Sequence, residues 1–374
     1  MNEKKLLMTA SVWTHIRNFH LPCLEAFRKL GWERHVACAG IPADAPGVDA
    51  AIEVPFEKRM TAPANFRAAN MLRRQIRKEN YDLVITHTTL AAFFTRLAVK
   101  GMKPRPPVVN VMHGYLFDDE TPALKRGVLL SAEKLVAPQT DLLLVMNEWD
   151  FEAAQRYRLG KRVERIPGMG VDFSRLDRVT EPREALRKRL GIPGDAFVLL
   201  CAAEFSARKS QAVLLRAMKD LPESAFLVLC GDGATLGECR SLAASLGVEK
   251  RTLFAGQFSD MPSWYGMADA CVSASRSEGL PFNLMEAMHC GLPAVASRVK
   301  GHTDLIEDGE SGLLYPYGDS AALAGQVARL MGDAALRQRL ASAASAKVAA
   351  YRVEAVLPQV MAKYLSATDG AGPE

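Results

Sequence analysis

The cysteines of this sequence show no paired spacing. Its 374 residues contain seven cysteines, scattered without a repeated spacing. An odd, unpaired set argues against a disulfide-stabilised secreted domain and indicates reduced thiols in the cytoplasm. Neither a CxxC nor an HExxH pattern occurs, and no Asp-x-Asp pair stands out. We therefore expect no metal site and no bound cofactor.

Long apolar runs are also missing. Runs such as DLLLVM and AFLVLC are far too short to cross a bilayer. The start, MNEKKLLMTASVW, places two lysines before a brief apolar run, but no small-residue cleavage site follows, so it predicts a first strand and not an export signal. Hydrophobic residues make up 49% of the chain, enough to fill the cores of two domains of ordinary size.

Acidic residues are sparse between Lys58 and Arg105, where basic residues crowd together. Such a stretch is either a solvated helix face or a patch for an anionic membrane surface or a phosphate-bearing acceptor. No groove-reading motif or aromatic stacking pattern accompanies it, so we do not expect a nucleic acid partner. The basic residues are Lys58, Arg59, Arg67, Arg73, Arg74, Arg77, Lys78, Arg96, Lys100, Lys103 and Arg105.

Strand-like and helix-like segments alternate along the whole chain. KKLLMTASV, YDLVITH and PPVVNVMHG read as strands with helical segments between them, and the alternation restarts at FVLLCAAEF after faltering near residues 166–196. This pattern predicts an α/β protein of two doubly wound, Rossmann-like domains with a cleft between them. We place the domains at residues 1–172 and 173–352. Residues 353–374 are a candidate helix for packing back on the first domain, with a frayed tail.

Ligands bind beyond the carboxyl ends of the strands in such sheets, and the segment SRSEGLPFNLMEAMHCGLPAVAS follows a strand in this way. Pro281 is typical of the first turn of a helix, and Gly291 is typical of the residue that follows the end of a helix. Amides at that helix start can bind a phosphate. Glu286 can accept hydrogen bonds from a ribose diol, and Glu278 lies toward the far end of such a ligand. The alternative is that both acids are exposed helix-end charges.

The text SEGLPFNLMEAM resembles the donor-binding signature of glycosyltransferase family 4, whose members are retaining enzymes of the GT-B fold. The phrases FHLP, YDLVITHT, VMHGYLF and IPGMGVD are similar to its exopolysaccharide and capsule branch, often called EpsD-like. The resemblance covers nearly the whole chain. It implies that Glu286 binds the ribose, that Glu278 contacts the donor sugar, and that the backbone of Phe282, Asn283 and Leu284 binds pyrophosphate.

The resemblance also implies that basic side chains bind the phosphates of the donor. In AAEFSARKSQ, Lys209 falls where the family has a phosphate-binding lysine, with Arg208 beside it. Many relatives have an arginine where this chain has Glu204. A cation after the first strand of the second domain could neutralise a leaving diphosphate. The alternative is an ordinary surface Arg-Lys pair.

Histidines follow two strand-like segments of the first domain. His113 comes after PPVVNVM, where the resemblance places the active-site histidine near the donor sugar; a packed structural histidine is the alternative. His15 and Arg17 follow the first strand as acceptor-side candidates, together with His20. For these residues, and for His87, a structural role is almost as plausible.

Glycines follow a later strand in LCGDGATLGE, but the third is one place late for the G-x-G-x-x-G fingerprint. The first strand is followed by SVWTHIRNF, which contains no glycine. Both observations argue against a nicotinamide or flavin enzyme. The resemblance places Gly231 and Gly233 beside the donor nucleotide, where they would allow close approach of the backbone.

These patterns favour a retaining, metal-independent glycosyltransferase that moves a sugar from a UDP-sugar to a lipid-linked or oligosaccharide acceptor. It would work in the cytoplasm, with peripheral attachment to the inner face of the membrane as a hypothesis. Two alternatives stay open: a UDP-sugar epimerase of similar fold, and a non-catalytic, sugar-nucleotide-binding partner of an assembly complex. The sugar, the linkage and the oligomeric state are not indicated.

Overall fold

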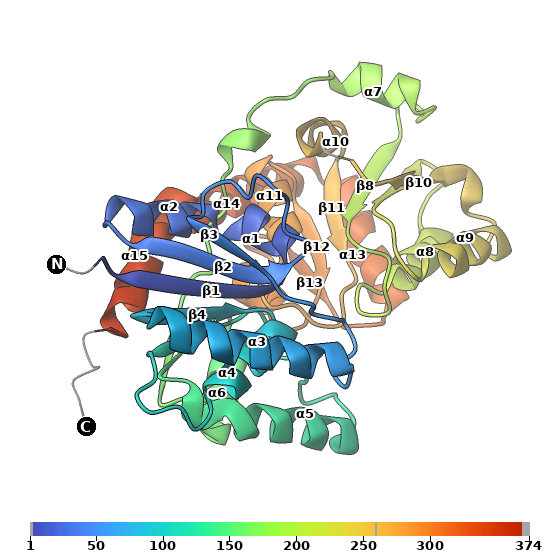
Figure 1. Ribbon diagram of the computed structural model, residues 1–374. Helices are drawn as coiled ribbons and strands as arrows, with labels where there is room; N and C mark the ends of the chain where they lie inside the picture. The colour runs from blue at the N-terminus through green and yellow to red at the C-terminus, as the bar shows by residue number, and fades with distance from the viewer. Residues whose placement is uncertain (1–2, 259, 369–374) are drawn as a thin grey trace. The chain divides into compact units, whose positions relative to one another are not determined.

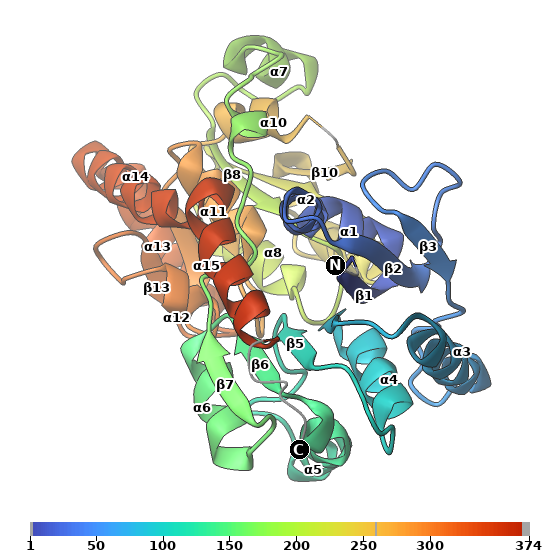
Figure 2. The same cartoon turned by 60° about the vertical axis from the view of Figure 1, so that its left-hand side comes forward.

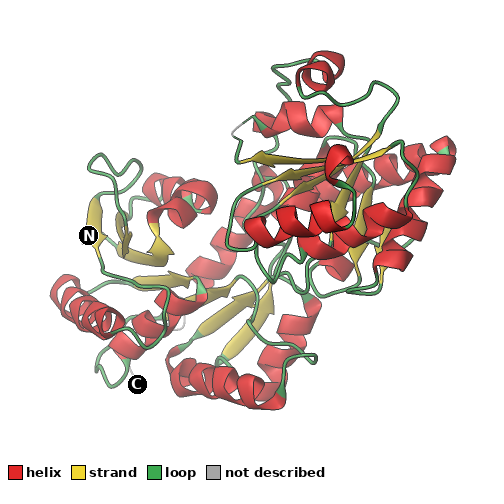
Figure 3. Cartoon of the chain, turned by 90° about the vertical axis from the view of Figure 1, so that its right-hand side faces the viewer, coloured by secondary structure: helices red, strands yellow, loops and turns green. Residues whose placement is uncertain are grey.

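The computed structural model describes residues 3–258 and 260–368, which divide into two compact units. Unit 1 contains residues 3–171 and 353–368, and unit 2 contains residues 172–352. Each unit is built on one parallel sheet with helices on both faces, as Figures 1 and 3 show. The α/β class with two Rossmann-like sheets, expected from the alternation of segments, is confirmed.

Unit 1 has a seven-stranded sheet in the order β3-β2-β1-β4-β5-β6-β7, and every neighbouring pair is parallel. Its central strands β4 and β5 are buried along their whole length, because helices cover both faces. The strands are β1 (Lys5–Val12), β2 (Glu33–Ala39), β3 (Ala50–Glu53), β4 (Leu83–His87), β5 (Val108–Met112), β6 (Leu142–Val145) and β7 (Arg162–Arg165).

Helices lie between most of these strands along the chain, and one more helix follows unit 2. They are α1 (Trp13–Phe19), α2 (Leu21–Lys29), α3 (Pro63–Glu79), α4 (Thr89–Val99), α5 (Ala123–Val136), η1 (Ala137–Gln139), α6 (Glu148–Tyr157) and α15 (Val353–Ser366). Figure 1 shows α3, α4 and α5 on one side of the sheet and α2 and α15 on the other. The chain order reverses between β1 and β4, which makes the carboxyl ends of these two strands the natural ligand position.

The last helix, α15, packs against α2 within unit 1 (Figure 2). The Val353 N–H donates to the Val171 carbonyl at 3.0 Å, and the rings of Phe27 and Tyr364 stack with their centroids 6.1 Å apart. Gly170 has φ +81°, and a Cβ there would lie 2.6 Å from the Val353 Cα. A glycine is therefore required where the end of the first segment meets the returning helix.

Unit 2 has a six-stranded parallel sheet in the order β10-β9-β8-β11-β12-β13, so its order reverses between β8 and β11. The strands are β8 (Phe197–Ala202), β9 (Ala225–Cys230), β10 (Thr252–Gly256), β11 (Ala270–Ser273), β12 (Ala294–Ser297) and β13 (Leu313–Tyr315). The helices are η2 (Ser174–Leu176), α7 (Arg183–Arg189), α8 (Gln211–Asp220), α9 (Leu236–Ser245), η3 (Glu249–Arg251), α10 (Met261–Met267), α11 (Phe282–His289), α12 (His302–Leu305), α13 (Ser320–Gly332), α14 (Ala334–Val348) and η4 (Ala349–Tyr351).

The basic stretch of unit 1 is smaller than the sequence suggests. Arg96 is fully buried, and its guanidinium donates to Glu133 at 2.9 Å and to the Ala92 carbonyl at 3.0 Å. Counting it in a surface patch was therefore wrong: a buried guanidinium needs a counter-ion and full hydrogen bonding. The exposed basic residues of the stretch are Lys58, Arg59, Arg67, Arg74, Arg77, Lys78, Lys100 and Lys103.

Among the described residues, no helix combines the length and apolar character that crossing a membrane requires.

Candidate functional site

Three loops of unit 2 leave the carboxyl edge of its sheet side by side, because β9, β8 and β11 are neighbours. They are residues 203–210 after β8, residues 231–235 after β9 and residues 274–281 after β11. Backbone hydrogen bonds join them in pairs: the Phe205 N–H donates to the Asp232 carbonyl at 2.8 Å, and the Arg276 N–H to the Arg208 carbonyl at 2.7 Å. The loops contain four of the eight residues expected to bind the donor, together with Glu278, and α11, which directly follows the third loop, contains the other four.

Glu278 joins two of these loops through ion pairs. Its side chain is only 7% exposed, and both carboxylate oxygens are paired. Lys209 Nζ donates to Oε1 at 2.6 Å, and Arg208 Nη1 donates to Oε2 at 2.8 Å. Burial alone would raise the pKa of Glu278, but the positive charges of Lys209 and Arg208 outweigh burial and lower that pKa to about 2. The carboxylate is therefore charged at neutral pH.

Helix α11 starts directly after this loop, with Pro281 as its N-cap and Phe282 as its first residue. The Asn283 side chain donates through Nδ2 to the Ala202 carbonyl at 2.8 Å, which fastens the helix start to the end of β8. The Leu284 N–H already donates to the Pro281 carbonyl at 3.1 Å, and the Leu284 side chain is buried. A pyrophosphate bound by the Leu284 amide would compete with that bond, so its role stays a prediction.

Glu286 lies one turn further along α11 and is also held in place. Its Oε2 accepts a hydrogen bond from the Tyr265 hydroxyl at 2.9 Å, and its Oε1 pairs with the Arg175 guanidinium. The Glu286 side chain is 12% exposed, whereas that of Arg175 is 52% exposed. Neither Glu278 nor Glu286 is a freely exposed helix-end charge, so that alternative is wrong.

Gly231 and Gly233 are required by the neighbouring loop. Their φ angles are +143° and +150°, and a Cβ on them would lie 2.0 Å from the Ala203 carbonyl oxygen and 2.3 Å from that of Phe205. Any side chain would therefore push the loops after β8 and β9 apart. The structure explains both glycines without a ligand, and their contact with a nucleotide stays a prediction.

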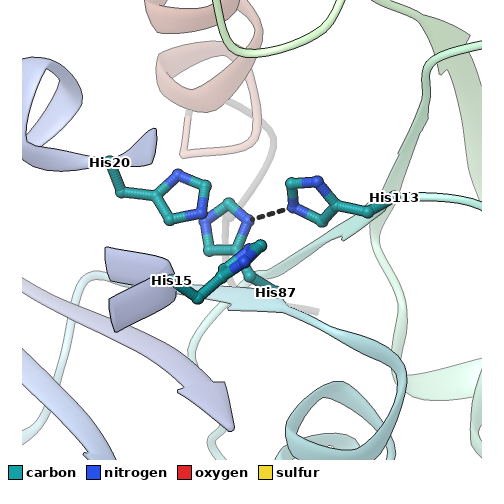
Figure 4. Close-up of side chains that lie close together, drawn as sticks. All are labelled: His15, His20, His87 and His113. Carbon is teal, nitrogen blue, oxygen red and sulfur yellow. Dashed lines mark hydrogen bonds between the residues drawn. The ribbon is translucent and has the colours of Figure 1, made fainter. Parts of the chain in front are cut away.

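Four histidines meet at the carboxyl edge of the unit 1 sheet (Figure 4). His15 lies in α1, His20 joins α1 to α2, His87 ends β4 and His113 directly follows β5. His87 Nδ1 and His113 Nε2 are 3.2 Å apart, and the rings of His20 and His87 stack with centroids 3.7 Å apart. The sequence named His15, His20 and His113 as candidates and left His87 open; the structure brings all four into one cluster.

Burial lowers the pKa of each of these four imidazoles, and repulsion between neighbouring rings lowers it further for His20, His87 and His113. The pKa of His15 falls to about 4. All four rings are therefore neutral at pH 7. Arg17, the other acceptor-side candidate, is exposed, and its Nε donates to Asn18 Oδ1 at 3.4 Å.

Comparison with known proteins identifies the chain. Residues 182–347 match the profile of the family described as Glycosyl transferases group 1, and residues 23–175 match that of Glycosyltransferase Family 4. The proposed glycosyltransferase EpsD of Bacillus subtilis (strain 168) is 33% identical over 343 residues, covering 90% of each chain. The chain belongs to glycosyltransferase family 4.

A second relative of this family 4 glycosyltransferase is named for the transfer of galactose. A protein of Escherichia coli named UDP-Gal:alpha-D-GlcNAc-diphosphoundecaprenol alpha-1,3-galactosyltransferase is 25% identical over 274 residues, covering 71% of this chain and 70% of its own.

Solved structures share the fold. HepE of Anabaena in complex with UDP-glucose has a TM-score of 0.79 at 22% identity, covering 97% of this chain and 99% of its own. Sucrose-phosphate synthase from Thermosynechococcus elongatus has a TM-score of 0.81 at 21% identity, covering 98% of this chain and all of its own. Units 1 and 2 are thus the two Rossmann-like domains of a GT-B glycosyltransferase.

The low pKa of Glu278 predicts a pH-dependent contribution to stability. The folded pKa of about 2 lies below the ordinary value of 4.5, so the contribution is complete above pH 4.5 and is lost as pH falls toward 2. We expect Glu278→Gln to lower the thermal unfolding midpoint by roughly 5–10 °C at pH 7. The gap to the native protein should shrink steadily between pH 4.5 and about 2.5.

The control is Glu238→Gln, because Glu238 is exposed on α9 and should leave the midpoint unchanged throughout. A gap between Glu278→Gln and the native protein that stays constant from pH 7 to pH 3 would show that Glu278 gains nothing from its charge.

Proposed function

We propose that this glycosyltransferase transfers a sugar from a UDP-sugar to a lipid-linked or oligosaccharide acceptor in cell-surface polysaccharide synthesis, with retention of configuration at the anomeric carbon. The family membership, the name of the Escherichia coli relative and the UDP-glucose complex of HepE support this donor and acceptor class. The reaction requires a site that binds a diphosphate and holds the sugar in a fixed orientation.

The observation that carries the proposal is the pairing of Glu278 with Lys209 and Arg208. One carboxylate is shared by two cations, which leaves one positive charge in excess beside the start of α11. A diphosphate leaving group gains negative charge as the sugar departs, and a fixed cation and a helix N-terminus stabilise that charge. The Arg208 side chain is 47% exposed and can reach a ligand without leaving the loop.

Glu286 fits the role of ribose acceptor. The Tyr265 hydroxyl fixes one of its carboxylate oxygens, and the exposed Arg175 covers the other. A ribose diol would displace Arg175 from that oxygen, because the Arg175 side chain is 52% exposed and can return to water. Both oxygens would then be satisfied in the complex, one by protein and one by ligand.

Unit 1 would contribute His113 to the reaction and His15 and Arg17 to the acceptor. Retention requires the acceptor hydroxyl to attack from the face that the diphosphate leaves. The leaving phosphate would take the proton from that hydroxyl, so no protein nucleophile is needed. No metal is needed at the diphosphate either, since Lys209, Arg208 and the start of α11 supply positive charge. Catalysis then rests on positioning and electrostatic stabilisation.

The proposal predicts that Glu278→Gln, Glu286→Gln and Lys209→Met each lower kcat/KM for transfer at least 100-fold, equivalent to about 3 kcal/mol. The assay offers a panel of UDP-sugars and lipid-linked acceptors and detects the glycan product by mass spectrometry. Glu238→Gln is the matched control and should stay within twofold of the native protein. A cooperative thermal unfolding transition confirms that each variant is folded.

Two results would contradict the proposal. Conversion of a UDP-sugar without any acceptor would identify an epimerase. Glycan assembly that proceeds normally with all three variants would identify a non-catalytic partner.

Unit 1 also carries features suited to a membrane surface, and we propose peripheral attachment there. Helix α5 exposes Leu124, Val128 and Leu135 on one face, beside the exposed Lys125 and Lys134. Apolar side chains flanked by lysines are typical of helices that lie in an anionic membrane interface. The acceptor expected for this enzyme would be presented at such a surface.

We expect binding to vesicles that contain phosphatidylglycerol to weaken about tenfold or more between 50 and 300 mM salt, because charge screening increases. Lys125→Gln with Lys134→Gln should weaken binding at low salt. The control pair, Arg216→Gln with Lys219→Gln, removes two exposed charges from α8 of unit 2. If vesicle binding is unchanged by salt and by the two substitutions in α5, this attachment is ruled out.

A further inference from the structure

We infer that His15, His20, His87 and His113, the histidine cluster, bind a divalent transition metal ion of the kind that imidazole prefers, with zinc the first choice. The inference goes beyond the proposed transfer and does not depend on it. The four residues come from well-separated segments, so no short motif of the sequence marks the site.

The geometry of the cluster is close to that of a metal site. One ring nitrogen from each histidine can be chosen so that all four lie within 4.8 Å of one another. A tetrahedral ion with Zn–N bonds of about 2.0–2.1 Å separates its ligand nitrogens by roughly 3.3–3.4 Å. His87 Nδ1 and His113 Nε2 already lie 3.2 Å apart, joined by a hydrogen bond. An ion would replace that bond once the shared proton has moved to the other nitrogen of its ring. Side-chain rotations that bring the widest pair closer by about 1.5 Å would complete the set.

Several nitrogens of the cluster are buried and have no hydrogen-bond partner among the described residues. They are both ring nitrogens of His20, Nε2 of His87 and Nε2 of His15. His20 and His87 are fully buried. Leaving a buried polar atom without a partner is unfavourable, so four such atoms in one cluster require an explanation. Coordination to an ion would satisfy one nitrogen lone pair on each ring.

The donor set selects the class of ion. The cluster offers imidazole nitrogens and no carboxylate among its grouped ligands. Imidazole suits Zn²⁺, Cu²⁺, Ni²⁺ and Fe²⁺, whereas Mg²⁺, Ca²⁺ and Mn²⁺ prefer oxygen ligands. The ion is therefore not the oxygen-bound cation that often accompanies nucleotide diphosphates.

The position of the cluster indicates that a bound ion would cross-link several segments of unit 1. The segments that carry it leave β1, β4 and β5, which are neighbours in the sheet at the point where the strand order reverses. An ion bound to all of them would hold these ends together and stabilise unit 1. Each imidazole has two nitrogens, so His113 and His15 can bind the ion through one and still present the other to a sugar hydroxyl.

The test uses the full chain without a histidine tag, treated with a chelator and dialysed at pH 7.5. Zn²⁺ affinity is measured by competition with a chromophoric chelator, and Co²⁺ is added as a spectroscopic probe. We expect one ion per chain, intense visible absorption from four-coordinate Co²⁺, and a higher unfolding midpoint with Zn²⁺. His15→Gln should lower the Zn²⁺ affinity about 100-fold, since even second-shell changes cost 10–100-fold.

The control is His289→Gln in unit 2, a histidine that stacks on Phe173 and pairs with Asp177 at 3.1 Å. It should bind Zn²⁺ like the native protein. The inference is overturned if the native chain shows no saturable binding at micromolar Zn²⁺, or if His15→Gln binds as tightly as His289→Gln. His15 is only half-buried, so its variant decides the question even where His20→Gln or His87→Gln fails to fold.

Discussion

A buried carboxylate that must stay charged is the constraint on which unit 2 depends. Glu278 is removed from water, and that loss is offset only because Lys209 and Arg208 both reach it. The ion pairs fasten the loop after β11 to the loop after β8. On the other side, Gly301 comes so close to Glu278 that a Cβ would lie 2.8 Å from the Glu278 Cβ. The loop is thereby fixed from two directions before any ligand arrives.

The fixed loop determines where α11 begins, and the helix start determines what the site can bind. Pro281 ends the loop and Asn283 ties the first turn to the end of β8, so the helix points its first amides to the carboxyl edge of the sheet. Glu286 then follows one turn later on the same helix. A rigid first turn flanked by two oriented carboxylates is the preorganisation that a glycosyl transfer enzyme needs, because positioning supplies much of its rate.

Sequence reasoning worked where local patterns decide the structure. Buried central strands such as β4 and β11 are mainly apolar runs. Pro281 precedes α11 and Gly291, at φ +80°, follows it, as expected. It missed the edge strands β3 and β7, because exposed edge strands lack an apolar run and read as loops. It also missed the burial of Arg96, since the partner Glu133 comes from a distant helix. The histidine cluster was assembled by topology, which spacing along the chain does not reveal.

The claim that Glu278 and Lys209 organise the donor edge is tested most directly by a double-mutant cycle. The free energy of unfolding of unit 2 is measured in urea for the native chain, Glu278→Gln, Lys209→Met and the double variant. The account predicts a coupling energy of at least about 1.5 kcal/mol, because each single change leaves a buried partner unpaired. Additive effects within about 0.5 kcal/mol would contradict it.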